Sequence, residues 1–283
     1  MGRFHVGVSG WRYPSWRGDF YPKGLPQRLE LTYAAERMTS IELNGSFYSL
    51  QRPTSYRRWR ESVPPSVDLA VKGGRFITHL KALRDVETPL ANFFASGVLA
   101  LGDQLGPFLW QLPERLTFDA DRVDAFFELL PRSTRRLADL AARHDDKVAQ
   151  GDALTTADAD ADRPVRHALE PRHPSFDTDE ARELCARHGV ALVVADTAGR
   201  FPVMRDATSD FRYVRLHGET ELYSGGYSDA SLDRWARQCR AWADEGLDVY
   251  VYFDNDAQGR APYDAVALLE RLDAAPTQPA PDA

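Results

Sequence analysis

The stretch Tyr213-Val214-Arg215-Leu216-His217 has the pattern of a barrel strand, because it is short, alternates in character and ends in a polar side chain. Side chains alternate along a strand, so Val214 and Leu216 lie on one face and Tyr213, Arg215 and His217 on the other. The apolar face packs under helices, and the polar face therefore points into a barrel lumen.

Eight such runs recur along the chain, with helical or loop-like segments between them. They are Phe4–Ser9, Thr39–Asn44, Asp68–Lys72, Pro107–Gln111, His167–Arg172, Ala191–Asp196, Phe211–His217 and Asp248–Asn255. Strands buried on both faces read as near-continuous apolar runs, and alternation with helices implies parallel pairing. The sequence therefore predicts an α/β fold, a TIM-like (β/α)8 barrel of parallel strands with its active site at the strands' carboxyl ends.

The segments between the runs predict the outer layer of helices. The candidates are Gln27–Met38, Ser55–Glu61, Pro89–Gly102, Asp121–Leu130, Arg135–His144, a helix opening at 177–180 and stopping at Gly189, Asp229–Glu245 after a Ser228 cap, and Tyr263–Leu272. We expect one domain over residues 1–273. Within it, residues 133–162 form an inserted, mobile, acidic segment between the fourth helix and the fifth strand, and residues 274–283 form a disordered tail.

The composition bounds the class of protein. The chain has 283 residues, a formal net charge of -7 and a pI near 5.5, so it has no global basic field for nucleic acid. Only four of its 35 basic residues are lysines, which makes each lysine informative. Cys185 and Cys239 lack metal or redox spacing and are expected to be core thiols. With no membrane-length apolar segment, we expect a soluble cytoplasmic protein.

Counting alternation back from each strand end predicts which polar side chains meet at the barrel mouth. The set is Glu42, Asn44, Lys72, Gln111, Glu170, Arg172, Asp196, Arg215, His217 and Asn255. Ion pairs that merely close the barrel top are the structural alternative. Replacing such pairs by apolar residues is often neutral or stabilising, so their number favours function.

Both signs of charge in one lumen indicate chemistry on an anion. Lys72, Arg172 and Arg215 are suited to hold a phosphate or carboxylate. Glu42 and Glu170 are then candidates for general acid, general base or nucleophile. His217 is a candidate proton shuttle, and so is His79 in the loop after the third strand.

Two aromatic loops flank this set. The first carries Trp11 and Tyr13, and the second carries Tyr227 after a Gly-Gly pair. Either loop serves as a lid or as a platform on which a sugar or base stacks. We count Trp11, Tyr13 and Tyr227 with the substrate-binding residues.

A metal site is the alternative chemistry. Glu42, Glu170, Asp196 and His217 are ligand types that divalent metals accept. Against a metal, the cations predicted for the same cavity compete for those carboxylates, and no HxH or HExxH spacing occurs. We therefore expect no metal and no cofactor, with a divalent ion as the open alternative.

The chain resembles the YecE-like family, a widespread group defined by a domain of unknown function. The resemblance rests on the motifs 7–13, Trp16, 20–22, 41–44, 46–48, 71–72, 76–79, 111–113, 170–175, 213–218, 227–228 and 252–255. It implies a TIM-like barrel and brings no established reaction. Asp254 departs from it, standing where the family often has asparagine.

The leading hypothesis is an enzyme, a hydrolase or lyase, that acts on a small phosphorylated, carboxylated or sugar-like ligand by carboxylate acid–base chemistry. The first alternative is a metal-dependent phosphodiesterase or nuclease acting on nucleic acid, which the acidic pI disfavours. The second is a noncatalytic ligand-binding protein. The oligomeric state is not predicted.

Overall fold

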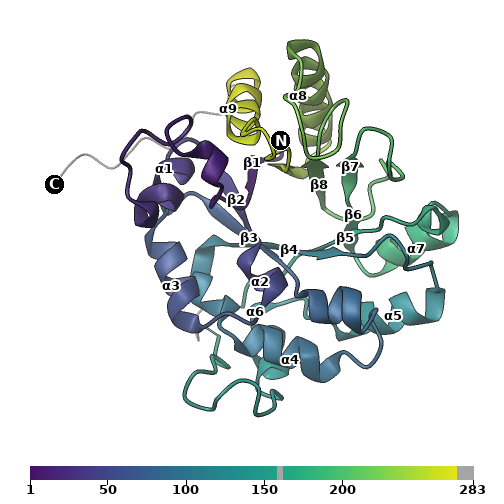
Figure 1. The fold of residues 1–283 in the computed structure, drawn as a ribbon. Helices are drawn as coiled ribbons and strands as arrows, with labels where there is room; N and C mark the ends of the chain where they lie inside the picture. Colours follow the sequence, from purple (N-terminus) through teal and green to yellow (C-terminus); the bar gives the residue numbers. More distant parts are fainter. Residues whose placement is uncertain (158–161, 273–283) are drawn as a thin grey trace. The chain divides into compact units, whose positions relative to one another are not determined.

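Strands and helices alternate along the chain, and the paired strands run parallel (Figure 1). The computed structural model describes residues 1–157 and 162–272. Its strand order is β6-β5-β4-β3-β2-β1-β9-β8-β7, with helices in the connections. This is the order of a TIM-like barrel, and it confirms the predicted fold class.

The chain divides by its internal contacts into two compact units. We call the part formed by Met1–Glu42, Ser62–Asp68 and the chain from Ala191 onward the terminal unit. We call the part formed by Leu43–Glu61 and Leu69–Val190 the middle unit. That residues 1–273 form a single domain stays a prediction.

The strands of the terminal unit are β1 (Phe4–Ser9), β2 (Ser40–Leu43), β7 (Val194–Asp196), β8 (Phe211–Leu216) and β9 (Asp248–Phe253). Strand β1 lies between β2 and β9. A Cβ atom at Gly7 would lie 1.7 Å from the Ser40 carbonyl oxygen, so only glycine permits this approach. The resulting register places Ser9 beside Glu42.

The helices of the terminal unit are α1 (Glu30–Ala35), α8 (Asp229–Asp244) and α9 (Ala261–Arg271). Ser228 caps α8 by accepting a hydrogen bond from the Ser231 backbone N–H, as predicted. The predicted apolar face of α8 is buried, including Trp235 and Trp242. A 3-10 turn, Gln27–Leu29, precedes α1.

The strands of the middle unit are β3 (Asp68–Lys72), β4 (Leu105–Gln111) and β5 (His167–Glu170). Its helices are α2 (Gly45–Tyr48), α3 (Pro53–Glu61), α4 (Glu87–Ala95), α5 (Ala120–Leu129), α6 (Thr134–Ala141) and α7 (Asp179–Arg187). Trp110 anchors the core, stacks near His167 and donates a 3.1 Å hydrogen bond to its Nδ1. Burial lowers the pKa of His167 to about 3, so this imidazole is a neutral part of the core.

Besides shifted ends, three differences from the prediction concern how the chain divides into elements. The sixth run is interrupted at Val193 and forms two short strands, β6 (Val190–Leu192) and β7. The run 89–102 forms α4 and a separate 3-10 segment, Val98–Gln104, because Gly97 between them has a φ of 118°. The short helix α2 was not predicted, since four residues carry no helical period.

The inserted segment contains helix α6, whose Leu137 and Ala141 are buried. Beyond α6, Asn92 donates a 2.9 Å hydrogen bond to Asp145. The Leu154 backbone N–H donates one of 2.9 Å to the carbonyl of Ala95. The mobility of the segment stays a prediction, and the predicted disordered tail at 274–283 lies outside the described residues.

Two chain-wide predictions concern cysteines and membranes. Cys185 and Cys239 are both buried and free, which confirms that they are core thiols. Within residues 1–157 and 162–272, no helix has the length and apolar character needed to cross a bilayer.

Candidate functional site

Glu42, at the end of β2, is fully buried and lies at the centre of a polar network. One carboxylate oxygen accepts hydrogen bonds from Ser9 Oγ (2.5 Å) and Arg215 Nη2 (2.9 Å). The other accepts from Tyr213 Oη (2.7 Å) and Arg215 Nε (3.1 Å). A carboxylate has about four lone-pair sites, so all are occupied by protein donors. This geometry favours a positioning role for Glu42 over the predicted acid–base role.

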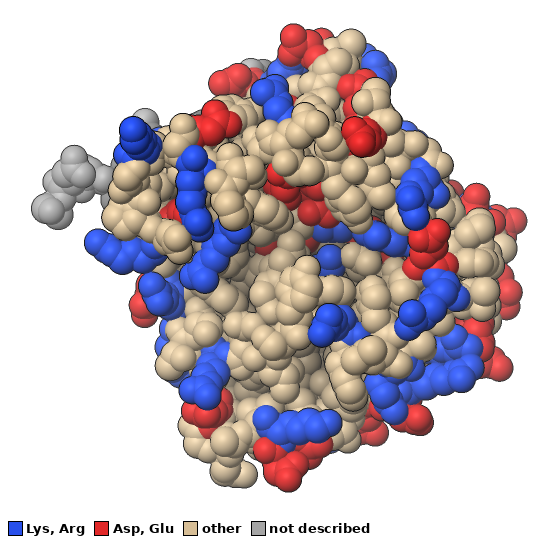
Figure 2. Space-filling model, viewed as in Figure 1, with Lys and Arg blue, Asp and Glu red and all other residues tan. Residues whose placement is uncertain are grey.

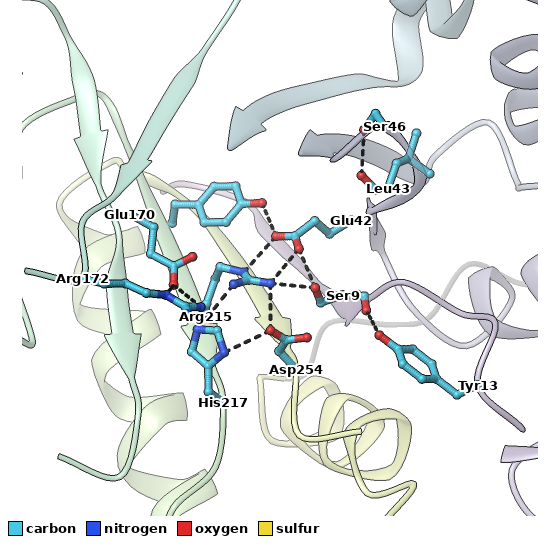
Figure 3. Close-up of polar contacts among 11 residues, drawn as sticks. Ser9, Tyr13, Glu42, Leu43, Ser46, Glu170, Arg172, Arg215, His217 and Asp254 are labelled. Carbon is cyan, nitrogen blue, oxygen red and sulfur yellow. Dashed lines mark hydrogen bonds and ion pairs between the residues drawn. The ribbon is translucent and has the colours of Figure 1, made fainter. Parts of the chain in front are cut away.

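Arg215, on β8, is also fully buried, and it serves several acceptors (Figure 3). Besides Glu42, its Nη2 donates to Ser9 Oγ (2.7 Å) and to Asp254 Oδ2 (3.0 Å). One guanidinium therefore faces two carboxylates, and their combined charge leaves no positive surplus for an anionic ligand. The structure assigns Arg215 to this network instead of the predicted anion clamp.

His217 completes the cluster, which we call the Glu42 network (Ser9, Glu42, Tyr213, Arg215, His217 and Asp254). Its Nδ1 lies 3.0 Å from Asp254 Oδ2, and its Nε2 lies 3.4 Å from Arg215 Nη1. Because a guanidinium only donates, Nε2 is the acceptor in its contact with Arg215. Nδ1 lies near the Asp254 carboxylate but does not form a hydrogen bond with it.

Asp254 belongs to the Glu42 network, although the sequence analysis did not predict it. Asn255, which was predicted at this position, lies elsewhere. In the register of β8 with β9, Arg215 lies beside Tyr252, so residues 250, 252 and 254 share its face. Asn255 lies on the opposite face and donates 2.8 Å to Asp264 Oδ2, on α9. Tyr250 and Tyr252 indicate the inner face in the sequence, because a buried tyrosine hydroxyl needs a hydrogen-bond partner.

Asp256, in the loop after β9, was also missed. Its side chain is buried, and neither carboxyl oxygen has a hydrogen-bond donor among the described residues. Tyr13 lies within hydrogen-bond reach, but its single hydroxyl proton is donated to the Ser9 carbonyl at 2.6 Å. Burial, and then the charge of nearby Asp254, raise the pKa of Asp256 well above its usual range. This shift favours the protonated form of Asp256 over a wider pH range than for an exposed aspartate.

Three predicted residues support loops instead of the Glu42 network. Asp196 pairs in register with Leu216, on the outer face of the strands, which corrects the predicted inner position. It accepts hydrogen bonds from Tyr227 and Trp235, and burial raises its pKa. Tyr227 Oη in turn accepts from the Gly218 N–H (3.1 Å), which ties the loop between β8 and α8. The third is Asn255, described above.

Trp11, in the first loop, is buried, and its carbonyl accepts a 2.8 Å hydrogen bond from Tyr21. The roles of this loop as a lid and as a ligand platform both stay predictions. Tyr13 of the same loop contacts Ser9 and Asp256 and so lies beside the Glu42 network.

The middle unit carries a second polar group at its strand ends. Gln111 and Glu170 are register partners on β4 and β5, and both are buried. Lys72 pairs with Leu109, two residues before Gln111, and so shares the same face. Arg172 donates two hydrogen bonds to one oxygen of Glu170, from Nε (3.3 Å) and Nη2 (3.2 Å).

His79 lies on a π-helical turn, Phe76–Leu80, and its ring stands edge-on to Phe47 at 5.2 Å. Burial and then the charges of Lys72 and Arg172 lower its pKa to about 4, with smaller effects from Arg115 and Arg75. We call Lys72, His79, Glu170 and Arg172 the anion site, because its imidazole is neutral at pH 7 and surrounded by cations.

The predicted residues thus divide between the two units. The terminal unit holds Trp11, Tyr13, Glu42, Asp196, Arg215, His217, Tyr227 and Asn255, and the middle unit holds Asn44, Lys72, His79, Gln111, Glu170 and Arg172. Their convergence in one cavity stays a prediction. Among the described residues, no three His, Cys, Asp or Glu side chains gather as metal ligands do.

A family model described as protein of unknown function DUF72 matches residues 5–283. The chain belongs to the DUF72 family. This confirms the resemblance read from the motifs. The DUF72 chain is 26% identical over 129 residues to the UPF0759 protein YecE of Escherichia coli K12, a match that spans 44% of this chain and 43% of YecE.

Solved structures of DUF72 proteins share the fold. One from Thermotoga maritima has a TM-score of 0.74 and 24% identity, with 96% of this chain and 99% of that one covered. One from Enterococcus faecalis has a TM-score of 0.73 and 14% identity, with 96% of each chain covered. At these identities the likeness extends to the fold, and the chemistry of DUF72 has to be argued from the side chains.

Proposed function

We propose that this chain is an enzyme, a hydrolase or lyase, that binds a small anionic ligand at the anion site and uses Glu170 for proton transfer. The observation that carries the proposal is the concentration of cations around His79 in the middle unit. Lys72, Arg172, Arg115 and Arg75 all act on that imidazole, and Glu170 is the carboxylate bound to Arg172. Phosphate and carboxylate groups bind to such clusters through charge-assisted hydrogen bonds.

The role of Glu170 follows from its partner. Arg172 holds one oxygen of the buried carboxylate, which fixes the plane of the group at the end of β5. A fixed carboxylate beside a bound anion is suited to move a proton to or from it. The ligand class remains phosphorylated, carboxylated or sugar-like, as the sequence predicts.

The nucleic-acid alternative is opposed by the overall charge, because a formal net charge of -7 repels a polyanion. In the face shown in Figure 2, Lys and Arg side chains gather along the left flank and at the lower right, with Asp and Glu side chains near them. A noncatalytic binding protein is the remaining alternative, and it predicts anion binding without turnover.

Removing the cations of the anion site is expected to weaken sulfate and phosphate binding. Lys72→Met and Arg172→Met should each raise the dissociation constant at least about tenfold, because each removes a charge-assisted contact worth ~1.5 kcal/mol or more. Lys23→Met, at an exposed lysine, is the matched control and should change nothing. Isothermal titration calorimetry measures these constants, and equal affinity for Lys72→Met and the control contradicts the proposal.

Sulfate binding is also expected to take up protons near pH 5. The neighbouring cations help hold the pKa of His79 at about 4 in the free protein, and a bound anion offsets them and raises that pKa. Between the free and bound pKa values, His79 gains a proton on binding. Calorimetry at pH 5 in two buffers of different ionisation enthalpy measures the uptake. His79→Gln should abolish it, and uptake that persists in this variant contradicts the assignment.

The proposed proton transfer by Glu170 is tested separately from anion binding. Release of inorganic phosphate from a panel of phosphate monoesters measures turnover, and Glu170→Gln is expected to lower it about a hundredfold or more while sulfate still binds. Binding without any turnover by the unmodified protein favours the noncatalytic alternative.

A further inference from the structure

A cavity of about 600 Å³ in the middle unit adjoins the anion site. We propose that it receives the apolar or aromatic body of a ligand whose anionic group binds at Lys72, so that the ligand class is an aryl or alkyl phosphate or carboxylate. This inference rests on the proposed function and specifies its substrate. Cavities of 300–1,000 Å³ are typical of sites that enclose a small organic molecule, whereas a bare phosphate fills only a fraction of this one.

Part of the cavity wall is apolar, and large apolar side chains are exposed there. Tyr48, Leu50, Phe76 and Leu80 line it, with exposed fractions of 67%, 41%, 44% and 66%. These are four of the seven large hydrophobic residues that are exposed in the described chain. Scattered exposed apolar residues need no explanation, but a group of them around one hollow marks a binding surface.

Cations border the same cavity. Arg75, Lys81 and Lys147 line it, and the guanidinium of Arg75 and the ammonium of Lys147 lie 6.0 Å and 5.2 Å from the ring centres of Tyr48 and Phe76. Lys81 is paired with Asp85 at 3.7 Å. Lys147 acts on the carboxylate of Asp145, which also lines the cavity. The lining therefore holds three cations and two carboxylates, and this positive excess attracts an anion.

Lysine usage adds weight to this placement. The chain has four lysines among 35 basic residues, and Lys81 and Lys147 are two of them. A third, Lys72, lies 4.7 Å from the ring of Phe47, which also lines the cavity. Two of the four lysines thus line the cavity, and a third contacts a residue of its wall. The compact, mobile ammonium of lysine suits a ligand of variable position.

Phe47 joins the cavity to the anion site. The ring of Phe47 contacts Lys72 and His79, and Phe47 also forms part of the cavity wall. Ser46, the preceding residue, donates a 2.7 Å hydrogen bond to the Lys72 carbonyl and fixes this wall to β3. An anionic group at Lys72 and an apolar body in the cavity would therefore both lie beside Phe47.

The backbone of this wall is also unusual. The π-helical turn Phe76–Leu80 is followed by Ala82, Leu83 and Asp85 with φ values of 48°, 67° and 49°. Left-handed conformations in residues other than glycine cost free energy and concentrate at ligand-binding segments, as π-helical turns do. A segment that only covered the core would not need either feature.

The test compares 1-naphthyl phosphate with inorganic phosphate by calorimetry on the full chain. We expect naphthyl phosphate to bind at least tenfold more tightly. Tyr48→Ser and Leu80→Ser, at positions whose side chains are 67% and 66% exposed, should remove most of this advantage and leave phosphate affinity unchanged. Val203→Ser, an exposed apolar residue outside this cavity, is the matched control.

The outcomes separate this inference from the proposed function. Equal affinity for the two ligands, with phosphate binding still dependent on Lys72, overturns the cavity proposal and leaves the anion site intact. A naphthyl advantage that survives both serine variants also overturns it. If the phosphate affinity is indifferent to Lys72→Met, the proposed function itself fails.

Discussion

Replacement of Arg215 by methionine is expected to lower the free energy of unfolding by about 3–5 kcal/mol. Methionine keeps much of the volume but removes the cation that faces Glu42 and Asp254. Glu42 is fully buried, and its remaining donors in the network are the hydroxyl groups of Ser9 and Tyr213. A buried carboxylate without its counter-charge is costly, whereas an exposed one is hydrated.

Denaturant unfolding at pH 7 measures this effect. The matched control is Arg3→Met, because Arg3 is 78% exposed and lies 3.9 Å from Asp248, so its ion pair contributes little. The double variant Glu42→Gln/Arg215→Met is expected to regain part of the loss, since a neutral amide needs no counter-charge. If Arg215→Met is as stable as Arg3→Met, the Glu42 network is not the buried ion cluster described above.

The fold follows from the sequence because the strands are short, apolar and separated by helical segments. Strand β1 begins and ends where the apolar run does, and β3 does too. The sixth run could not be divided at Val193, because a local break in hydrogen bonding leaves no mark in an unbroken apolar stretch. Boundaries set by hydrogen bonds are therefore less predictable than runs set by burial.

The face of the strand on which each side chain lies was predicted well only where the two faces differ in polarity. In β8, Arg215 and Tyr213 alternate with Val214 and Leu216, and the inner face is evident. In β9, both faces are apolar or aromatic. Alternation counted back from Asn255 therefore assigns the side chains of this strand to the wrong faces. The hydroxyl of Tyr252, which forms a 2.7 Å hydrogen bond with Ser40, identifies the inner face.

The sharing of one guanidinium by several acceptors was not readable from the sequence. Ser9, Glu42 and Asp254 are separated from Arg215 by 206, 173 and 39 residues. The sequence does not show that two carboxylates face the guanidinium of Arg215. Lys72 and Arg172 carry the anion proposal because their charges act together on His79.

The other large effect is a gain of stability. Asp256→Asn is expected to raise the free energy of unfolding at pH 7 by about 1–3 kcal/mol, the usual cost of a buried polar group that ionises or lacks its partner. Burial and the charge of Asp254 raise the pKa of Asp256 in the folded protein, so folding retains a proton that the unfolded chain releases. This cost is absent below the ordinary pKa of aspartate and grows as the pH rises toward the raised value.

Asparagine has the same shape and does not ionise, so it removes this pH-dependent cost. Unfolding measured from pH 4 to pH 8 should therefore show a flatter profile for Asp256→Asn than for the unmodified protein. Asp254→Asn is the matched control two residues away, and it should destabilise, because it removes the carboxylate that binds Arg215 and His217. A loss of stability in Asp256→Asn, or a profile parallel to that of the unmodified protein, would show that Asp256 is ionised. The predicted gain instead shows that the folded protein holds the proton of Asp256 to a higher pH than the unfolded chain does.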